Sequence, residues 1–388
     1  MINLLDLVLP ELEAFVVSLG EPVYRGRQLF RWLWHKGVAD LAVMTDLGKG
    51  LRVALTERAI ISWPRIVSEV VSCDGTVKLL LELADGARIE TVLIPFDLDE
   101  SSDRGGMGGE GVMRSWRTHL NGAARTGYVT QCLSTQVGCI LGCSFCSTGT
   151  MGFTRNLRVG EILGQVLLGR VYLARQTAAG IEPRRLRRLV FMGMGEPLLN
   201  LGELLRALEI LVHIQGLNFS PRRITVSTVG LPRGLDELGA VARVSLAISL
   251  HAPTQELRER IMPRAAFFPL SELMTTLDRY PLKSRQRITY EYLLLKDIND
   301  GLAEARQLVK LLEDRKAKVN LITYNQVPGL SYATPSPERV LAFENLLRAK
   351  YMTVTLRKSK GADIAAACGQ LRVRLSDSES VHRAEAKV

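Results

Sequence analysis

Three closely spaced cysteines could hold a metal centre. Cys139, Cys143 and Cys146 form a C-x3-C-x2-C pattern. Thiolates this close together suit an iron–sulfur cluster or zinc. A four-iron cluster usually takes four cysteines, so three local thiolates would leave one iron open to a small molecule. Zinc is the alternative, but the segment supplies no fourth Cys or His at the spacing of a zinc finger.

Two further cysteines outside this pattern could do thiol chemistry. Cys132 precedes the pattern, and Cys368 lies near the C-terminus. Such a cysteine is either a nucleophile, acting as its thiolate, or an inert packing residue. Cys73 fits no functional pattern, and we expect it to be a packing cysteine.

Several polar residues come directly after segments that are expected to be strands. Glu196 lies in a Gly-Met-Gly-Glu-Pro turn, and Ser227, His251 and Asn325 follow later apolar runs. Glycines let the backbone approach a ligand, and a carboxylate can pair with an ammonium group. A glycine-rich turn is also common without any ligand, and a lone His is more often structural.

The elements that must position these residues alternate between strands and helices. The expected strands are 128–133, 189–192, 224–227, 245–250, 289–294, 319–323 and 353–356, and the expected helices are 160–175, 201–214, 302–313 and 337–350. Such alternation predicts right-handed parallel βα units in an open sheet or a barrel, with the site at the carboxyl ends of the strands. The spacing alone leaves both a full and a partial barrel open.

The N-terminal part of the chain has a different pattern. Apolar residues at helical spacing in 9–19 and 27–34 predict helices, and Asp85-Gly86 between two apolar runs predicts a hairpin of 78–83 with 88–94. We expect four parts: a helical domain (1–62), a hairpin with a mobile glycine-rich loop (63–126), an α/β core (127–375) and a disordered tail (376–388).

Composition and charge narrow the class of protein. The 388 residues contain no apolar run long enough to span a membrane and no N-terminal secretory pattern, so we expect a cytoplasmic protein. The net charge is −5 over residues 1–100 and +15 over the remainder. A basic surface attracts polyanions such as nucleic acid, although a solvated basic protein without such a partner has the same composition.

The cysteine pattern, directly after a predicted strand, resembles the radical S-adenosylmethionine (SAM) superfamily. The surrounding segments resemble the RlmN family and its relative Cfr. These segments are 132–139, 146–157, 193–200, 249–252 and 361–371. The resemblance implies a partial (β/α)6-type radical SAM barrel with a small N-terminal helical accessory domain and a connecting β-hairpin.

The resemblance also implies cofactors and the residues that bind them. One 4Fe-4S cluster would be held by Cys139, Cys143 and Cys146, and two SAM molecules would be used per turnover. Six residues would contact SAM: Gly195, Glu196, Ser227, Ser249, His251 and Asn325.

The family's chemistry gives the other two cysteines a role. An adenine ring carbon is not nucleophilic, so it cannot take a methyl group directly from SAM. In the family a thiol corresponding to Cys368 accepts the methyl group, and a radical on that carbon adds to adenine. Glu90 would accept the ring proton, and Cys132 would attack the Cys368 sulfur, leaving a disulfide. An electron donor or reductant of the flavodoxin or thioredoxin type is therefore expected.

The family's substrates are adenosine carbon 2 in 23S rRNA and in tRNA. Arg357, Lys358 and Lys360 would hold phosphates near Cys368, and the runs Arg184–Arg188 and Arg222–Arg223 add positive charge. One alternative is a Cfr-like enzyme acting on carbon 8, and another is a zinc-bound, non-catalytic RNA-binding protein. The long glycine-rich connection between Glu90 and Cys132 departs from the family pattern.

Overall fold

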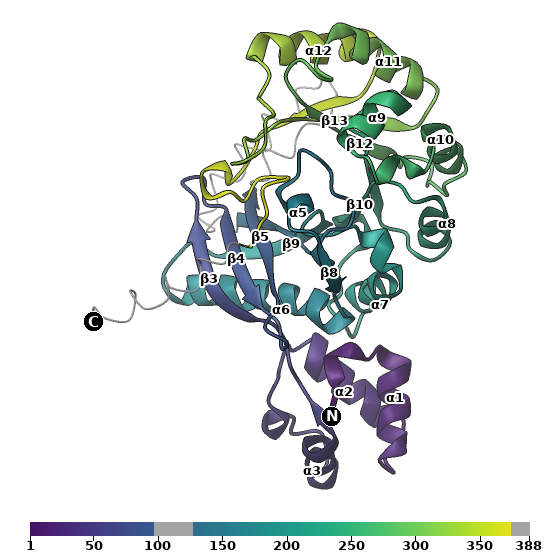
Figure 1. Cartoon of the computed structure of the whole chain (residues 1–388). Helices are drawn as coiled ribbons and strands as arrows, with labels where there is room; N and C mark the ends of the chain where they lie inside the picture. Colours follow the sequence, from purple (N-terminus) through teal and green to yellow (C-terminus); the bar gives the residue numbers. More distant parts are fainter. Residues whose placement is uncertain (97–126, 374–388) are drawn as a thin grey trace, which may run out of the picture.

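A curved ten-stranded sheet forms the centre of the protein (Figure 1). The structure, a computed structural model, describes residues 1–96 and 127–373. Seven adjacent strands are parallel: β6 (Gly127–Cys132), β9 (Arg184–Phe191), β10 (Ile224–Thr228), β11 (Ser245–Ser249), β12 (Ile288–Leu294), β13 (Ala317–Thr323) and β14 (Val354–Arg357). Among the described residues the sheet stays open, with β14 at one edge. The predicted partial barrel is therefore confirmed.

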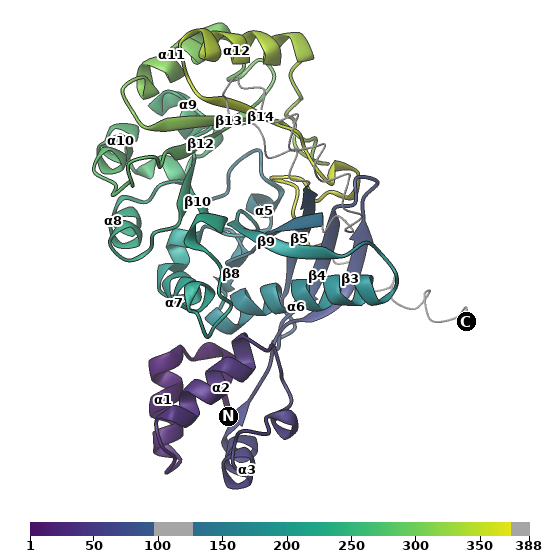
Figure 2. The same cartoon turned by 180° about the vertical axis from the view of Figure 1, so that it is seen from behind.

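Helices cover the outer face of the parallel strands, as Figure 2 shows from behind. They are α6 (Val159–Ala178), α7 (Leu201–Val212), α8 (Pro232–Val241), α9 (Gln255–Ile261), α10 (Leu270–Asp278), α11 (Leu302–Leu312) and α12 (Pro337–Ala349). In α7 the buried Leu204, Leu208 and Leu211 repeat at helical spacing and face the sheet. In β11 the consecutive Leu246, Ala247 and Ile248 are buried, as in strands covered on both faces.

Three antiparallel strands extend the sheet on the side of β6. They are β3 (Arg65–Val71), β4 (Val77–Glu82) and β5 (Arg88–Phe96), and β5 pairs with β6. The predicted hairpin is β4–β5, with Gly86 at a φ of +82° in its turn. Strand β3 was not predicted, because this edge strand lies mostly at the surface and lacks an apolar alternation.

The N-terminal helices form a separate lobe below the sheet in Figure 1. They are α1 (Leu9–Ser18), α2 (Tyr24–Trp34) and α3 (Lys49–Arg58). Two of these helices were predicted, and the lobe has its own buried side chains, including the fully buried Trp34. Arg206 of α7 joins the lobe to the core: its guanidinium binds the Glu11 carboxylate, with both N–O distances at 2.6 Å.

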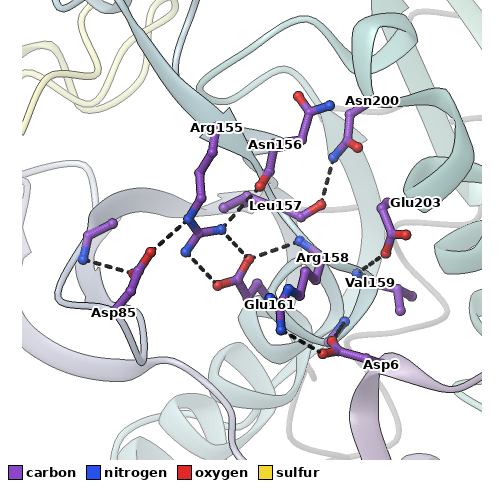
Figure 3. Close-up of polar contacts among 12 residues, drawn as sticks. Asp6, Asp85, Arg155, Asn156, Leu157, Arg158, Val159, Glu161, Asn200 and Glu203 are labelled. Atoms are coloured by element: carbon purple, nitrogen blue, oxygen red, sulfur yellow. Dashed lines mark hydrogen bonds and ion pairs between the residues drawn. The ribbon is translucent and has the colours of Figure 1, made fainter. Parts of the chain in front are cut away.

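The amino end of α6 is a junction between these parts (Figure 3). Its first amides point to carboxylates from different elements: Gly160 N donates to Asp6 of the N-terminal lobe at 3.2 Å, and Val159 N donates to Glu203 of α7 at 2.6 Å. Carboxylates stabilise a helix amino end by binding its free amides and opposing its dipole. The lobe is therefore fixed relative to the core at this helix end.

Arg155 connects the β4–β5 hairpin to this junction (Figure 3). It lies in the short strand β8 (Phe153–Asn156), which pairs with β7 (Gln136–Gly138). Its guanidinium binds Glu161 with two contacts of 2.8 Å and Asp85 in the β4–β5 turn at 2.7 Å. The pair β7–β8 carries the cysteine segment between its strands, so Arg155 braces the base of that segment.

Some sequence expectations fall outside the described residues. The glycine-rich loop lies within 97–126 and the tail within 374–388, neither of which the structure describes. Among the described residues, no helix has both the length and the apolar character needed to cross a membrane.

Candidate active site

The carboxyl ends of the parallel strands surround a cavity of about 870 Å³, here called the ligand cavity. The three cysteines of the pattern line it, together with five of the six residues expected to contact SAM. These lining residues are Cys139, Cys143, Cys146, Gly195, Glu196, Ser227, Ser249 and His251. Residues more than a hundred positions apart in the sequence thus meet at one edge of the sheet, as the pattern of strand ends predicted.

Backbone hydrogen bonds at its two ends and in its middle hold the loop that carries the three cysteines. Gly138 has a φ of +77°, and a Cβ there would lie 2.0 Å from the carbonyl oxygen of Gly152, so a side chain is excluded. Cys139 N donates to the same carbonyl at 2.7 Å. On the far side of the loop, Ser144 N donates to the Ile261 carbonyl at 3.0 Å. The loop is therefore anchored at both ends and at its middle.

The chemistry of this donor set fits an iron–sulfur cluster. Burial raises the pKa of Cys139 to about 12, and it also raises the pKa of Cys143 and of Cys146. The thiols are neutral in the protein alone, and a bound metal would deprotonate them. In the part of the chain that the structure describes, no three His, Cys, Asp or Glu side chains converge on a single metal ion. The three thiols instead line one cavity together.

Gly195 and Glu196 form the polar side of the ligand cavity. Gly195 has a φ of +98°, and a Cβ there would lie 2.5 Å from Gln136 Cβ. The Glu196 carboxylate accepts hydrogen bonds from Thr228 Oγ1 at 2.6 Å and from Val229 N at 3.0 Å. Burial raises the pKa of Glu196, and these hydrogen bonds oppose the rise. A carboxylate has more acceptor positions than these partners fill, so Glu196 can also pair with a ligand ammonium.

His251 is held as a neutral imidazole. Its backbone has a φ of +56°, and its Nδ1 accepts a hydrogen bond from Leu293 N at 3.1 Å. Burial lowers the pKa of His251 to about 3, and the positive charge of Arg258 adds to the effect. With Nδ1 acting as acceptor, the ring proton lies on Nε2. The ring meets Phe145 edge-on, with centroids 5.1 Å apart, and both residues line the ligand cavity.

Arg258 was missed by the sequence reasoning. This arginine of α9 is 1% exposed, and it donates to the carbonyls of Val229 at 2.6 Å and Leu250 at 3.1 Å. It thereby ties together the chain segments that leave β10 and β11. Burial lowers its pKa to about 10, whereas the neighbouring Cys143 and Glu196 raise it. Nothing in the sequence distinguishes Arg258 from the exposed Arg260 two positions later.

A second cavity of about 500 Å³, the thiol cavity, contains both remaining candidate thiols. Cys132, at the end of β6, and Cys368 line it, and neither forms a disulfide. Burial raises the pKa of Cys132 to about 12, and Cys368 adds to this rise. The two cavities share part of their walls: Met192, Ile322, Arg357 and Cys368 line both. Cys368 therefore lies where the ligand cavity meets the thiol cavity.

Asn325 and Arg357 also line the thiol cavity. The Nδ2 atom of Asn325 is buried and has no hydrogen-bond partner among the described residues, so it can donate to a ligand. Asn325 does not line the ligand cavity itself, unlike the other expected SAM contacts. The negative charge of a Cys368 thiolate raises the pKa of Arg357, and Glu291 and Cys132 add to this rise. Arg357 is therefore a cation beside the two thiols. From the sequence it was expected only to bind phosphate.

Glu90 is a buried carboxylate in the antiparallel strand next to β6. It is the third residue of β5 and is 1% exposed, so it is not an ordinary exposed carboxylate of a hairpin. Its carboxylate lies 3.0 Å from Lys78 Nζ and accepts a hydrogen bond from Arg372 N at 2.8 Å. Glu90 lines neither cavity. The packing role expected for Cys73 is also wrong, because this residue is exposed.

The two basic runs begin at the amino ends of β9 and β10, whereas the cavities lie at the carboxyl ends of the parallel strands. Arg184 begins β9, and Arg222 and Arg223 directly precede β10. The guanidinium groups of Arg187 and Arg188 lie 4.3 Å from the ring centroids of Tyr128 and Phe96. None of these arginines lines either cavity.

Two family models match the chain. The model of the ribosomal RNA large subunit methyltransferase N-terminal domain matches residues 2–61, and that of the radical SAM superfamily matches residues 133–312. A solved radical SAM methyltransferase from Sphaerobacter thermophilus is 40% identical, with a TM-score of 0.80 over 96% of this chain and 99% of its own.

Curated relatives match over almost the whole chain. The dual-specificity RNA methyltransferase RlmN of Solidesulfovibrio magneticus is 55% identical over 96% of this chain and 97% of its own length. The protein of the same name from Geobacter sulfurreducens is 43% identical over 97% of this chain and 93% of its own. With the N-terminal lobe, the radical SAM core and almost the whole length matched, the chain belongs to the RlmN family within the radical SAM superfamily.

Proposed function

We propose that this protein is an RNA methyltransferase that modifies carbon 2 of adenosine in 23S rRNA and in tRNA, with Cys368 as the methyl carrier. The observation that carries this proposal is the position of Cys368 in the wall shared by the two cavities. From there one sulfur can reach the SAM site on one side and Cys132 on the other. The family membership supports the reaction class, because the curated relatives are named dual-specificity RNA methyltransferases.

The residues of the ligand cavity would bind the cluster and SAM, and those of the thiol cavity would carry out the methyl transfer. When bound, the cluster and two SAM molecules supply a methyl group and then an organic radical that removes hydrogen. Cys139, Cys143 and Cys146 would hold the cluster, and the contacts in the ligand cavity would orient SAM, with Glu196 facing its ammonium group. Phe145 and the buried walls keep water away from the reacting atoms.

The thiol cavity would complete the transfer. Cys368 Sγ accepts the methyl group as a thiolate, and Arg357 stabilises that negative charge. Once the methylene carbon is bonded to the adenine ring and the adduct has given up its unpaired electron to the cluster, Glu90 accepts the ring proton and Cys132 Sγ attacks Cys368 Sγ as a thiolate. The carbon–sulfur bond breaks with its electron pair going to the carbon, which takes up a proton and becomes the methyl group. The methylated base leaves and a disulfide remains. Two electrons from a thioredoxin- or flavodoxin-type reductant restore both thiols, which places the enzyme in a reducing cytoplasm.

The comparisons favour carbon 2 over the Cfr-like alternative of carbon 8. The relatives that match over nearly the full chain carry the RlmN name, and the N-terminal lobe matches the model of that methyltransferase. A zinc-bound, non-catalytic protein is disfavoured by the match to the radical SAM superfamily and by the likeness to a solved radical SAM methyltransferase.

The test is mass spectrometry of the Cys132→Ala variant, purified without oxygen from cells and digested with nuclease. Without the second thiol, the bond between Cys368 and the base is formed but not resolved, so an adenosine adduct should remain on Cys368. Sequencing the attached RNA identifies the substrate. Cys73→Ala is the matched control, because this exposed cysteine lies outside both cavities.

The control should carry no nucleotide. The proposal is overturned if Cys368 in cluster-loaded Cys132→Ala protein carries neither a methyl group nor a nucleotide. Attachment of a base other than adenosine would overturn the substrate assignment and leave the thiol mechanism standing.

A further inference from the structure

The segment that carries Cys368, residues 361–372, is bound directly to the loop of the three cluster cysteines. Ser147 N donates to the Gly369 carbonyl at 2.7 Å, and Thr148 Oγ1 donates to the Leu371 carbonyl at 2.7 Å. Gly369 and Leu371 are the first and third residues after Cys368. Both donors belong to the short helix α5 (Ser147–Thr150), which begins immediately after Cys146. The two chain segments lie beside each other in both views (Figures 1 and 2).

Thr148 faces Cys146 as well as the Cys368 segment. It is 4% exposed and lies two residues after Cys146, and its polar groups oppose the rise that burial causes in the pKa of the Cys146 thiol. A hydroxyl group has one proton, and here that proton goes to the Leu371 carbonyl. Thr148 is therefore a buried polar contact between one of the three cluster cysteines and the chain next to Cys368.

Other contacts also hold the segment. Beyond Cys368, Gln370 Nε2 donates to the Gln326 carbonyl at 3.0 Å and Arg372 N donates to the Glu90 carboxylate at 2.8 Å. Asp74 Oδ2 accepts from Gly361 N at 2.9 Å, and Asp363 Oδ1 accepts from Ser72 Oγ at 2.6 Å, so the β3–β4 turn binds the start of the segment. Between this start and Cys368, Ala365 adopts a φ of +51°, and Gly369 follows with +80°. The chain thus bends on both sides of Cys368. The position of Cys368 therefore depends on the contacts of the residues that follow it, 369–372.

We propose that Thr148 is a positioning residue that transmits the state of the cluster loop to Cys368. Metal binding at Cys146 fixes the start of α5, and α5 in turn holds Gly369 and Leu371. Cys368 is then presented to the ligand cavity when the loop is loaded and is held less firmly when it is empty. The inference rests on the proposed roles of Cys146 and Cys368, and it adds a physical link between them.

The first test measures the freedom of the segment, not the activity. Amide hydrogen exchange of residues 361–372 and the rate of Cys368 alkylation by iodoacetamide are measured without oxygen, in cluster-free and in cluster-loaded protein. Thr148→Val keeps the shape of the side chain and removes the hydroxyl. One hydrogen bond of this kind corresponds to roughly a fivefold change in a local opening equilibrium, so both rates should rise about fivefold in the cluster-free variant.

The loaded protein tests the transmission itself. Cluster loading should slow Cys368 alkylation in the wild type, and Thr148→Val should lose most of that protection at equal iron content. Thr148→Ser restores the hydroxyl and should restore the wild-type rates. Thr276→Val is the matched control: Thr276 is a buried threonine of α10 whose hydroxyl has no partner among the described residues. Its replacement should leave the rates of the segment unchanged.

A second variant tests the neighbouring bond without altering Thr148. Ser147 is the first residue of α5, where proline is compatible with a helix, and Cys146 before it has φ −109° and ψ 124°, as a residue before proline prefers. Ser147→Pro removes the amide that binds Gly369, whereas Ser147→Ala keeps it. Faster alkylation in the proline variant but not in the alanine variant supports the link.

Unchanged exchange and alkylation in both Thr148→Val and Ser147→Pro would overturn the inference, whatever the iron content. That failure is distinct from a failure of the proposed function, which the Cys132→Ala adduct reports separately. An adduct that forms normally while Thr148→Val leaves the segment unaffected removes the link and keeps the reaction. The spectrum and midpoint potential of the loaded cluster give a further reading, because loss of a hydroxyl near a cysteine ligand should shift the potential.

Discussion

The carboxylate of Glu90 accepts a hydrogen bond from the backbone amide of Arg372 at 2.8 Å, four residues beyond Cys368. The other side of this carboxylate faces Lys78 Nζ at 3.0 Å, and Lys78 in turn lies 3.4 Å from the Ala365 carbonyl. Glu90 therefore holds the end of the segment in addition to its proposed role as proton acceptor. These two roles can be separated by substitution.

Glu90→Gln should stop the reaction without releasing the segment. The Gln side chain keeps an oxygen that can accept from Arg372 N but cannot take the ring proton. We expect RNA-bound Cys368 to accumulate, with hydrogen exchange of residues 361–372 close to that of the wild type. Glu90→Ala should lose both functions and exchange faster. Turnover by Glu90→Gln above about a hundredth of the wild-type rate would argue against Glu90 as the base.

Gly195→Ala should weaken SAM binding by about tenfold or more. The residue has a φ of +98°, and an added Cβ would lie 2.5 Å from the Gln136 side chain, so the turn before Glu196 has to move. Gly202→Ala is the control, because nothing lies within 4 Å of a Cβ there and the residue is in α7. Calorimetric titration with SAM checks both variants. Equal affinities would show that the turn does not contact the ligand.

Arg258→Met should destabilise the core by about 3 kcal/mol, because it removes a buried cation, leaves the Val229 carbonyl without its donor and takes away one of the two donors to the Leu250 carbonyl. The exposed Arg260 of the same helix is the control, and Arg260→Met should change the free energy of unfolding by less than about 0.5 kcal/mol. Urea denaturation of cluster-free protein measures both. Similar values for the two variants would contradict the structural role of Arg258.

The lowered pKa of His251 should make the folded protein less stable in acid. Its pKa is about 3 in the folded protein and near 6.5 when unfolded, because burial disfavours the charged ring. Between these values the unfolded chain binds more protons, so lowering the pH through this range favours unfolding. The contribution of His251 is complete above pH 6.5 and falls by up to about 1.4 kcal/mol per pH unit below it.

His251→Asn should remove this part of the pH dependence. Asn tolerates the left-handed backbone at this position, and its Oδ1 can accept from Leu293 N in place of the imidazole. Urea denaturation of cluster-free protein between pH 4 and 7 compares the two proteins. Parallel curves over that range would show that His251 is not the titrating group.

The sequence predicted the strands of the core well because their apolar runs are buried on both faces. The same logic placed Glu196, Ser227 and His251 at one edge of the sheet, and their lining of a single cavity agrees with it. It missed helices α8 to α10, which are short or carry charged residues between their apolar positions. It also misjudged Cys73, since a single cysteine has no pattern from which burial can be read.

Contacts between distant segments were beyond the reach of sequence patterns. Arg258 is buried because three chain segments close around it, and no spacing rule marks it. Likewise, the binding of Arg372 to Glu90 joins residues 282 positions apart. A motif identifies a side chain that could do chemistry. The residues that contact this side chain depend on how the whole sheet curves.

The curvature of the open sheet has a consequence for synthesis of the chain on the ribosome. The Cys368 segment follows the last strand, yet it binds the β3–β4 turn, which precedes the first parallel strand, with up to 291 positions between partners. Chains fold from the N-terminus as they emerge, and contacts over such separations form late. The N-terminal lobe and the cysteine loop are made long before Cys368 leaves the ribosome. A prematurely terminated chain would therefore keep the three cysteines proposed to hold the cluster and lack Cys368, the proposed methyl acceptor.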